Sequence, residues 1–95
     1  MPFQVLWLPQ ALENLADLVE QVAAHDLLAA ADLYDDLWHA PDSLTRTPVV
    51  IHKPSPFVAG QREIVVRPNY LVLYELDEVA MTATVTAVYH ARQLR

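Results

Sequence analysis

The pattern of apolar and polar positions predicts a short strand followed by two helices in the first half of the chain. Residues 3–8 alternate well enough to favour a short strand that places Phe3, Val5 and Trp7 on one face and ends at Pro9. Over residues 10–24, apolar side chains recur every three or four positions, with acidic and amide side chains between them, which is typical of an amphipathic helix. Residues 27–39 repeat that spacing after Asp26, a residue type that caps helix N-termini.

The second half of the chain has the two-residue period and the β-branched content of strands. Residues 63–67 and 70–75 are separated by a proline and an asparagine, which predicts a hairpin. A further strand is expected over residues 82–89. The order β-α-α-β-β-β predicts an α+β fold in one domain, residues 1–95, with an antiparallel helix hairpin packed on a mostly antiparallel sheet of three to four strands.

A proline-rich segment connects the helices to the predicted hairpin. Residues 45–59 contain three prolines and a small apolar island at residues 49–51, so we expect an extended surface segment with room for a brief edge strand. The chain's single glycine, Gly60, follows this segment. Because glycine takes positive φ at no steric cost, we expect a backbone corner there.

Charge limits the range of partners. The chain has 12 acidic and 6 basic residues, for a net charge of −6 with neutral histidines. Such a charge repels a polyphosphate at long range, so direct nucleic-acid binding is not expected. The acidic residues crowd the first half, which predicts an acidic helical side and a more basic strand side. The basic residues all lie in the second half: Arg46, Lys53, Arg62, Arg67, Arg92 and Arg95.

The apolar content predicts a protein partner, and no segment predicts a membrane location. Hydrophobic residues make up 54% of the chain, above the roughly 45 to 50% of typical soluble domains, and a partner protein or a second copy of the chain commonly covers such a surplus. No window reaches the roughly 18 consecutive apolar residues of a membrane helix, and the first residues lack the basic region of a signal peptide. With no cysteine, and no metal-ligand spacing among His25, His39 and His52, we expect a cytoplasmic protein without metal or cofactor.

Six short motifs follow one another along the chain. They are Val5-x-Trp7, Ala11-x-x-x-Leu15, Ala29-Ala30-x-x-Leu33, Gly60-x-Arg62-Glu63, Asn69-Tyr70-x-x-x-Tyr74 and Val88-x-His90-Ala91-Arg92. In this combination, over nearly its whole length, the sequence resembles the ParE/RelE toxin superfamily of bacterial type II toxin-antitoxin modules. Its ending, residues 89–93, is more similar to the ParE branch than to the RelE branch.

The resemblance implies a toxin that performs no chemistry of its own. ParE-like members poison DNA gyrase by stabilising the state in which the enzyme is covalently attached to broken DNA, and a cognate antitoxin protein neutralises them in a hetero-oligomeric complex. RelE-like members instead cleave mRNA on the ribosome. A third interpretation is a non-toxic member that only binds its partner.

The residues available for RNA cleavage favour the ParE-like interpretation. Attack by the RNA 2′-hydroxyl requires a proton acceptor, a proton donor and cations beside the phosphate. The chain offers only a small set of candidates for these tasks. RelE-like members resemble one another in a lysine- and arginine-rich active face and often a catalytic tyrosine near the C-terminus, whereas this chain has one lysine in total and no tyrosine after Tyr89. We therefore expect no catalytic residue. If the protein were an RNase, the candidates would be His90, Arg62, Arg67 and Lys53.

The candidate target-binding residues lie on the predicted hairpin and at the C-terminal end. They are Arg62, His90, Arg92 and Arg95, because residues 91–95 are expected to form a flexible basic end without a folding role. Arg62 is equally well explained by an ion pair with Glu63 or with a carboxylate elsewhere.

The apolar stripe of the two helices is the candidate antitoxin-binding surface. A disordered C-terminal part of the antitoxin is expected to fold over the helix pair and the adjoining sheet edge. The candidate residues are Leu12, Leu15, Val19, Leu33 and Leu37. Trp7 and Trp38 are instead expected in the core.

Overall fold

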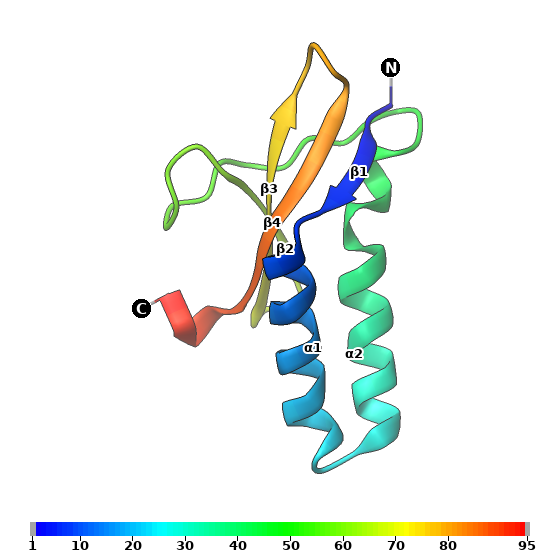
Figure 1. Ribbon diagram of the computed structural model, residues 1–95, viewed down its shortest axis with the longest axis vertical. Helices are drawn as coiled ribbons and strands as arrows, with labels where there is room; N and C mark the ends of the chain where they lie inside the picture. Colours follow the sequence, from blue (N-terminus) through cyan, green and yellow to red (C-terminus); the bar gives the residue numbers. More distant parts are fainter. Residues whose placement is uncertain (1, 95) are drawn as a thin grey trace.

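Two antiparallel helices pack against a four-stranded sheet in the computed structural model, which describes residues 2–94 (Figure 1). The strands and α-helices are β1 (Gln4–Trp7), α1 (Pro9–Ala23), α2 (Leu27–His39), β2 (Arg62–Val66), β3 (Tyr70–Asp77) and β4 (Thr82–His90). Two short 3-10 helices, η1 (Ala40–Leu44) and η2 (Ala91–Leu94), follow α2 and β4. The predicted α+β element order is confirmed.

The sheet has the spatial order β1-β4-β3-β2. The last three strands of the chain are joined by hairpins and are antiparallel, whereas β1 lies parallel to β4 at the opposite edge from β2. In the register, Val5 pairs with Ala83, and Val72 lies between Ile64 and Val88. The first strand therefore completes the sheet by pairing with the last one, which is the mostly antiparallel arrangement predicted from the sequence.

The helices form where apolar side chains reach the sheet at regular intervals. Pro9 begins α1, where its missing N–H costs nothing because the first turn has no intrahelical partner for it. Asp26 caps α2, and its Oδ1 accepts the Ala29 N–H at 3.0 Å. Neither helix in the described part of the chain has the length and apolar character needed to cross a membrane. The buried helical side chains Ala11, Leu15, Leu18, Leu33 and Leu37 join Ile64, Val72, Tyr74, Val85 and Val88 of the sheet in one core.

Within residues 2–94, three residues at backbone corners take positive φ. Gly60 has φ 79°, which confirms the corner predicted there. Arg67 and Met81 adopt φ values of 49° and 55° in the two hairpin turns, although both carry a Cβ atom. In the second turn, the Asp77 Oδ1 accepts the N–H groups of residues 79 and 80 at 3.0 and 2.9 Å. Glycine is therefore not required for every residue with positive φ in this chain.

The segment between η1 and β2 has no strand at residues 49–51. Val49 packs against the core instead, and the chain reaches β2 only later, at an isolated bridge between Pro54 and Arg62. Glu63 donates its N–H to the Lys53 carbonyl at 3.0 Å. The loop thus pairs with the beginning of the outer edge of β2.

Asn14 of α1 completes the outer edge of β4. β1 pairs with β4 only as far as Trp7 and Val85. Beyond that point the Asn14 Oδ1 accepts the Val88 N–H at 3.2 Å. A helix side chain therefore satisfies a strand donor that β1 is too short to reach.

Candidate partner-binding surface

Arg62 is held by the loop that crosses the edge of β2. Its Nη1 donates to the His52 carbonyl at 2.8 Å. Tyr74 lies directly opposite Arg62 in the β2–β3 register, and its buried hydroxyl accepts the His52 backbone N–H at 2.9 Å. The same hydroxyl lies 3.0 Å from the His52 Nδ1. These three residues, here named the His52 clamp, fix the loop to the sheet.

Burial shifts the pKa values of two groups in the His52 clamp, His52 and Tyr74. Desolvation lowers the pKa of His52 below its ordinary value of 6.5, because the partly buried ring is less stable when charged. Burial raises the pKa of Tyr74, an effect opposed by the hydrogen bond from the His52 backbone and by the charge of Arg62. A neutral ring leaves Nδ1 free to accept a hydrogen bond from the Tyr74 hydroxyl.

Glu63 points to the opposite face of the sheet from Arg62, as neighbouring strand residues must. It is 3% exposed, and its Oε1 lies 3.3 Å from the Lys53 Nζ. Its Oε2 is buried and has no hydrogen-bond partner. Adjacent residues of β2 therefore find separate partners in residues 52 and 53 of the loop, and no Arg62–Glu63 ion pair forms.

Arg67 follows β2 and ties the β2–β3 hairpin to α2. Its Nε and Nη2 lie 2.8 and 2.7 Å from the Asp36 Oδ2. Both side chains are exposed, so this pair is expected to stabilise the fold by only about 0 to 1 kcal/mol. Arg62 and Arg67 are separated by the length of the strand, roughly 17 Å at the usual rise per residue.

Residues 91–94 form η2 and not the flexible segment expected from the sequence. In η2 the Gln93 Oε1 accepts the His90 N–H at 2.7 Å, and the His90 Nδ1 accepts the Arg92 N–H at 3.1 Å. The His90 ring also lies edge-on to Tyr70, with ring centroids 5.1 Å apart. Arg92 is therefore exposed on a fixed turn, while Arg95 lies outside the described residues.

The four residues considered for RNA cleavage are not brought together. Lys53 contacts Glu63, Arg62 contacts a loop carbonyl, Arg67 contacts α2, and His90 caps η2. None of the three main hollows formed by residues 2–94 is lined by any of these side chains. The structure thus places each of them in a different local arrangement.

Most of the leucines expected to bind an antitoxin lie in the core. Leu15, Leu33 and Leu37 are buried, so in this conformation their side chains are not available to a partner. The helical period identified the apolar stripe correctly, but the sheet covers that stripe. Of the predicted set, only Leu12, 43% exposed, and the partly buried Val19 remain at the surface.

Three aromatic rings form a partly exposed stack that the sequence reasoning missed. The Trp7 and Trp38 ring centroids are 4.9 Å apart, and those of Tyr34 and Trp38 are 6.2 Å apart. Trp38 was expected in the core, yet it and Tyr34 are exposed on α2. Their spacing of four residues places them on one helix face, which was the available sequence signal.

A groove of about 460 Å³ runs between α2 and the outer edge of β2. It is lined by Asp35, Asp36, His39, Ala40, Ile64, Val65 and Val66. The Glu63 N–H points outward to the loop, so the N–H and C=O of Val65, two residues later, also point outward. This open stretch of strand edge lies beside an apolar floor and an acidic wall.

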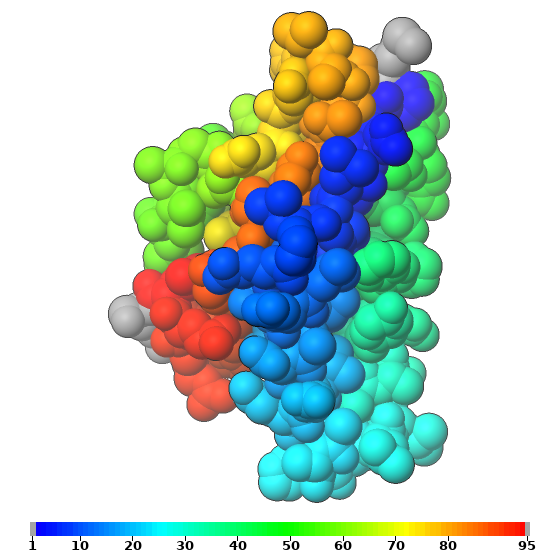
Figure 2. Space-filling model, viewed as in Figure 1, coloured from blue at the N-terminus to red at the C-terminus, as the bar shows by residue number. Residues whose placement is uncertain are grey.

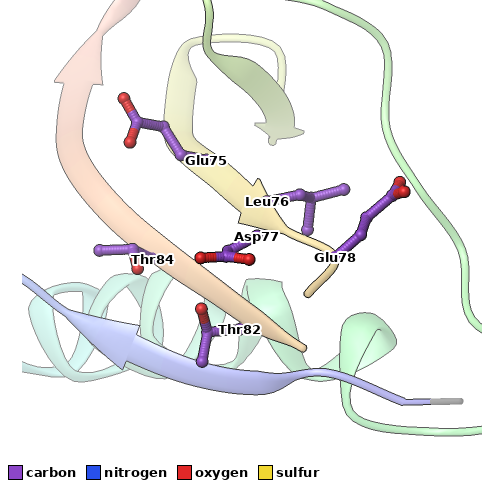
Figure 3. Close-up of a pocket in the computed structure, with 6 residues that line it drawn as sticks. All are labelled: Glu75, Leu76, Asp77, Glu78, Thr82 and Thr84. Atoms are coloured by element: carbon purple, nitrogen blue, oxygen red, sulfur yellow. The ribbon is translucent and has the colours of Figure 1, made fainter. Parts of the chain in front are cut away.

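A second hollow, of about 580 Å³, lies beside the β3–β4 turn and is acidic (Figure 3). Figure 3 shows the Glu75 and Glu78 side chains pointing away from each other. Asp77 is used by the turn, and Glu75 accepts a hydrogen bond from Gln61. Within residues 2–94, no three histidine, aspartate or glutamate side chains are grouped to hold a metal ion. The strand side expected to be more basic therefore also carries an acidic hollow.

Comparisons with known proteins agree with this fold. A chain in the chromosomal ParDE toxin-antitoxin system from P. aeruginosa is similar in fold, with a TM-score of 0.76 and 12% identity, over 93% of this chain and 95% of that chain. A chain in the toxin-antitoxin complex RelBE2 from Mycobacterium tuberculosis is similar with a TM-score of 0.60 and 25% identity, over 95% and 99% of the two chains. No curated protein sequence matches. The family model for the ParE toxin of the type II toxin-antitoxin system parDE matches residues 5–95, and the chain therefore belongs to the ParE toxin family.

Proposed function

We propose that this ParE-family protein inhibits DNA gyrase in the cytoplasm by binding it and stabilising its cleaved-DNA complex, without chemistry of its own. The separation of Lys53, Arg62, Arg67 and His90 into different local contacts supports this proposal. An RNase would need a proton acceptor, a proton donor and cations around one phosphate. Binding to a protein target requires no such cluster.

The test combines purified protein with gyrase, ATP and supercoiled plasmid, followed by denaturation and protease treatment to release trapped breaks. Linear DNA should accumulate in proportion to the protein added, and only when gyrase is present. A parallel reaction with translating ribosomes measures cleavage of mRNA. Cleaved mRNA without linear DNA would favour the RelE-like alternative, which the similarity to RelBE2 supports. Folded protein that is inactive in both reactions would favour a non-toxic member.

The groove between α2 and β2 is the best candidate for antitoxin binding. The two similar chains come from toxin-antitoxin systems. Val65 is 51% exposed, and its N–H and C=O point outward from the sheet edge. An extended antitoxin segment can pair with these groups and add a strand to the sheet. Asp35 lines one wall, and Asp36 beside it is already paired with Arg67. A segment with apolar side chains and a basic side chain opposite Asp35 therefore fits this groove.

A proline at position 65 tests this binding mode. Val65→Pro removes the outward N–H, and a proline there keeps the pairing with β3 because that N–H faces away from β3. Affinity for the cognate antitoxin should fall at least tenfold, as expected for blocking a central contact. Val65→Thr keeps the N–H and is the matched control. Equal antitoxin affinities for the two variants, with both folded, would place the antitoxin elsewhere.

A further inference from the structure

A short apolar loop protrudes beside the His52 clamp. Residues 54–60, here named the Phe57 loop, read Pro-Ser-Pro-Phe-Val-Ala-Gly and contain no charged side chain. Phe57 is 52% exposed. Figures 1 and 2 show this light-green segment extending from the left side of the molecule, on the same side as η2 and away from α2. An uncharged apolar protrusion of this kind contributes little to the core and marks an interaction site.

The Phe57 loop is stiffened by its own hydrogen bonds. The Ser55 Oγ accepts the N–H groups of Phe57 and Val58, each at 3.1 Å. The Ser55 N–H donates to the Gln61 carbonyl at 2.8 Å, and the Gln61 N–H donates to the Val58 carbonyl at 3.3 Å. Two prolines fix φ within the loop, and Gly60 closes it with φ 79°. The loop therefore has few alternative conformations to lose on binding.

Both ends of the Phe57 loop are attached to the sheet. Before it, Lys53 contacts Glu63, and the His52 clamp holds the preceding residue. After it, Gln61 is buried and its Oε1 accepts the Thr86 hydroxyl at 2.6 Å, while its amide donates to Glu75. The phenylalanine is thus displayed from a loop fixed to three strands.

We propose that the Phe57 loop is a target-binding element that inserts Phe57 into an apolar pocket of the target protein. This inference rests on the proposed function, because the target is taken to be gyrase. A pre-ordered aromatic side chain loses little entropy when it docks, and aromatic anchors commonly dominate protein interfaces. A loop without charges, in a chain of net charge −6, fits an apolar protein pocket and not a phosphate backbone.

The Phe57 loop and the groove proposed for the antitoxin lie on different sides of the molecule. The Phe57 loop extends on the side of η2, which carries the exposed Arg92, whereas the groove lies along α2 (Figure 1). Of the predicted target-binding residues, His90 and Arg92 therefore share a side with the loop. Phe57 would supply the apolar anchor that this basic set lacks.

The decisive variant is Phe57→Ala. The protein concentration that gives half-maximal gyrase-dependent linear DNA should rise at least tenfold, as for other buried interface anchors. Its melting temperature and its antitoxin affinity should match those of the unchanged protein, because the ring is half exposed and lies away from the groove. Phe57→Trp should retain activity, and Val79→Ala, which changes a 98% exposed side chain in the β3–β4 turn, is the control.

Growth arrest on expression without antitoxin provides a readout that does not assume gyrase. If the unchanged protein arrests growth without trapping gyrase, the proposed target is wrong, and the arrest assay still compares Phe57→Ala with the control. If Phe57→Ala keeps full activity in the assay in which the unchanged protein is active, this inference is wrong and the proposed function stands. A loss of antitoxin binding equal to the loss of toxicity would also contradict it. A folded protein without any toxicity would overturn both proposals.

Ser55→Ala tests the stiffness of the loop without changing the ring. Loss of the two hydrogen bonds should loosen the Phe57 loop and raise the half-maximal concentration by roughly threefold, a smaller effect than removal of the anchor. Activity equal to that of the unchanged protein would show that loop order does not contribute to target binding.

Discussion

The α1–α2 hairpin and the outer edge of β2 are stabilised in different ways. The helices use apolar side chains at regular spacing and a local cap, Asp26 on Ala29. The edge of β2 instead depends on polar contacts between residues far apart in sequence. His52 and Tyr74 are 22 residues apart, Gln61 and Thr86 are 25 apart, and Arg67 and Asp36 are 31 apart.

This difference separates the part of the molecule that holds the fold from the part that is free to bind. Side chains of the helical stripe are already committed to the core, so few of them can serve a partner. The edge of β2 keeps open backbone groups at Val65 and displays Phe57, while its polar contacts leave the local conformation fixed. Partner binding is accordingly proposed at the edge and its loop.

The largest effect is expected in the core. Leu37 has no exposed surface, so Leu37→Ala should lower the free energy of unfolding by about 2 to 5 kcal/mol. Leu28→Ala, at a position that is 80% exposed on the same helix, should change it by less than about 0.5 kcal/mol. Chemical denaturation of both variants measures the difference. Similar values would mean that the helix pair does not depend on this buried stripe.

An intermediate effect is expected for the His52 clamp. Tyr74→Phe removes the hydroxyl that the His52 N–H and Nδ1 both contact, and leaves a partly buried donor without a partner. The free energy of unfolding should fall by about 1 to 3 kcal/mol, and exchange of the His52 amide hydrogen should accelerate. Tyr70→Phe is the control, because Tyr70 packs edge-on to His90 through its ring. If His52 exchange is unchanged in Tyr74→Phe, the clamp does not hold the loop.

The smallest effect is the pH dependence that His52 contributes. Its pKa is lower in the folded state than the ordinary 6.5, so between these two values the unfolded chain binds more protons. The free energy of unfolding should therefore rise with pH through this window. The contribution of His52 should be fully present above 6.5 and should be lost as the pH falls through the folded-state pKa. Melting temperatures between about pH 5 and pH 8 should vary less in His52→Gln. An unchanged pH profile would exclude this contribution.

The regular elements were predictable because their signals are local. Residues 27–39 form α2 as predicted, and β2 begins one residue earlier than expected. Periodicity shows that the helices carry an apolar stripe, but not whether the sheet or a partner covers it. The sequence alone therefore predicts a partner-binding role for leucines that lie in the core. Periodicity also could not predict that Arg62 binds the His52 carbonyl or that Arg67 reaches α2. These contacts depend on how segments far apart in the sequence pack together.

The pairing of β1 with β4 has a consequence for how the toxin is made. The central strands β3 and β4 emerge from the ribosome long after the helix pair that covers them. Until they do, the apolar stripe of the helices has no sheet to cover, and a premature stop before β4 yields no complete sheet. The helix pair and the sheet can therefore pack together only after β4 has been synthesised.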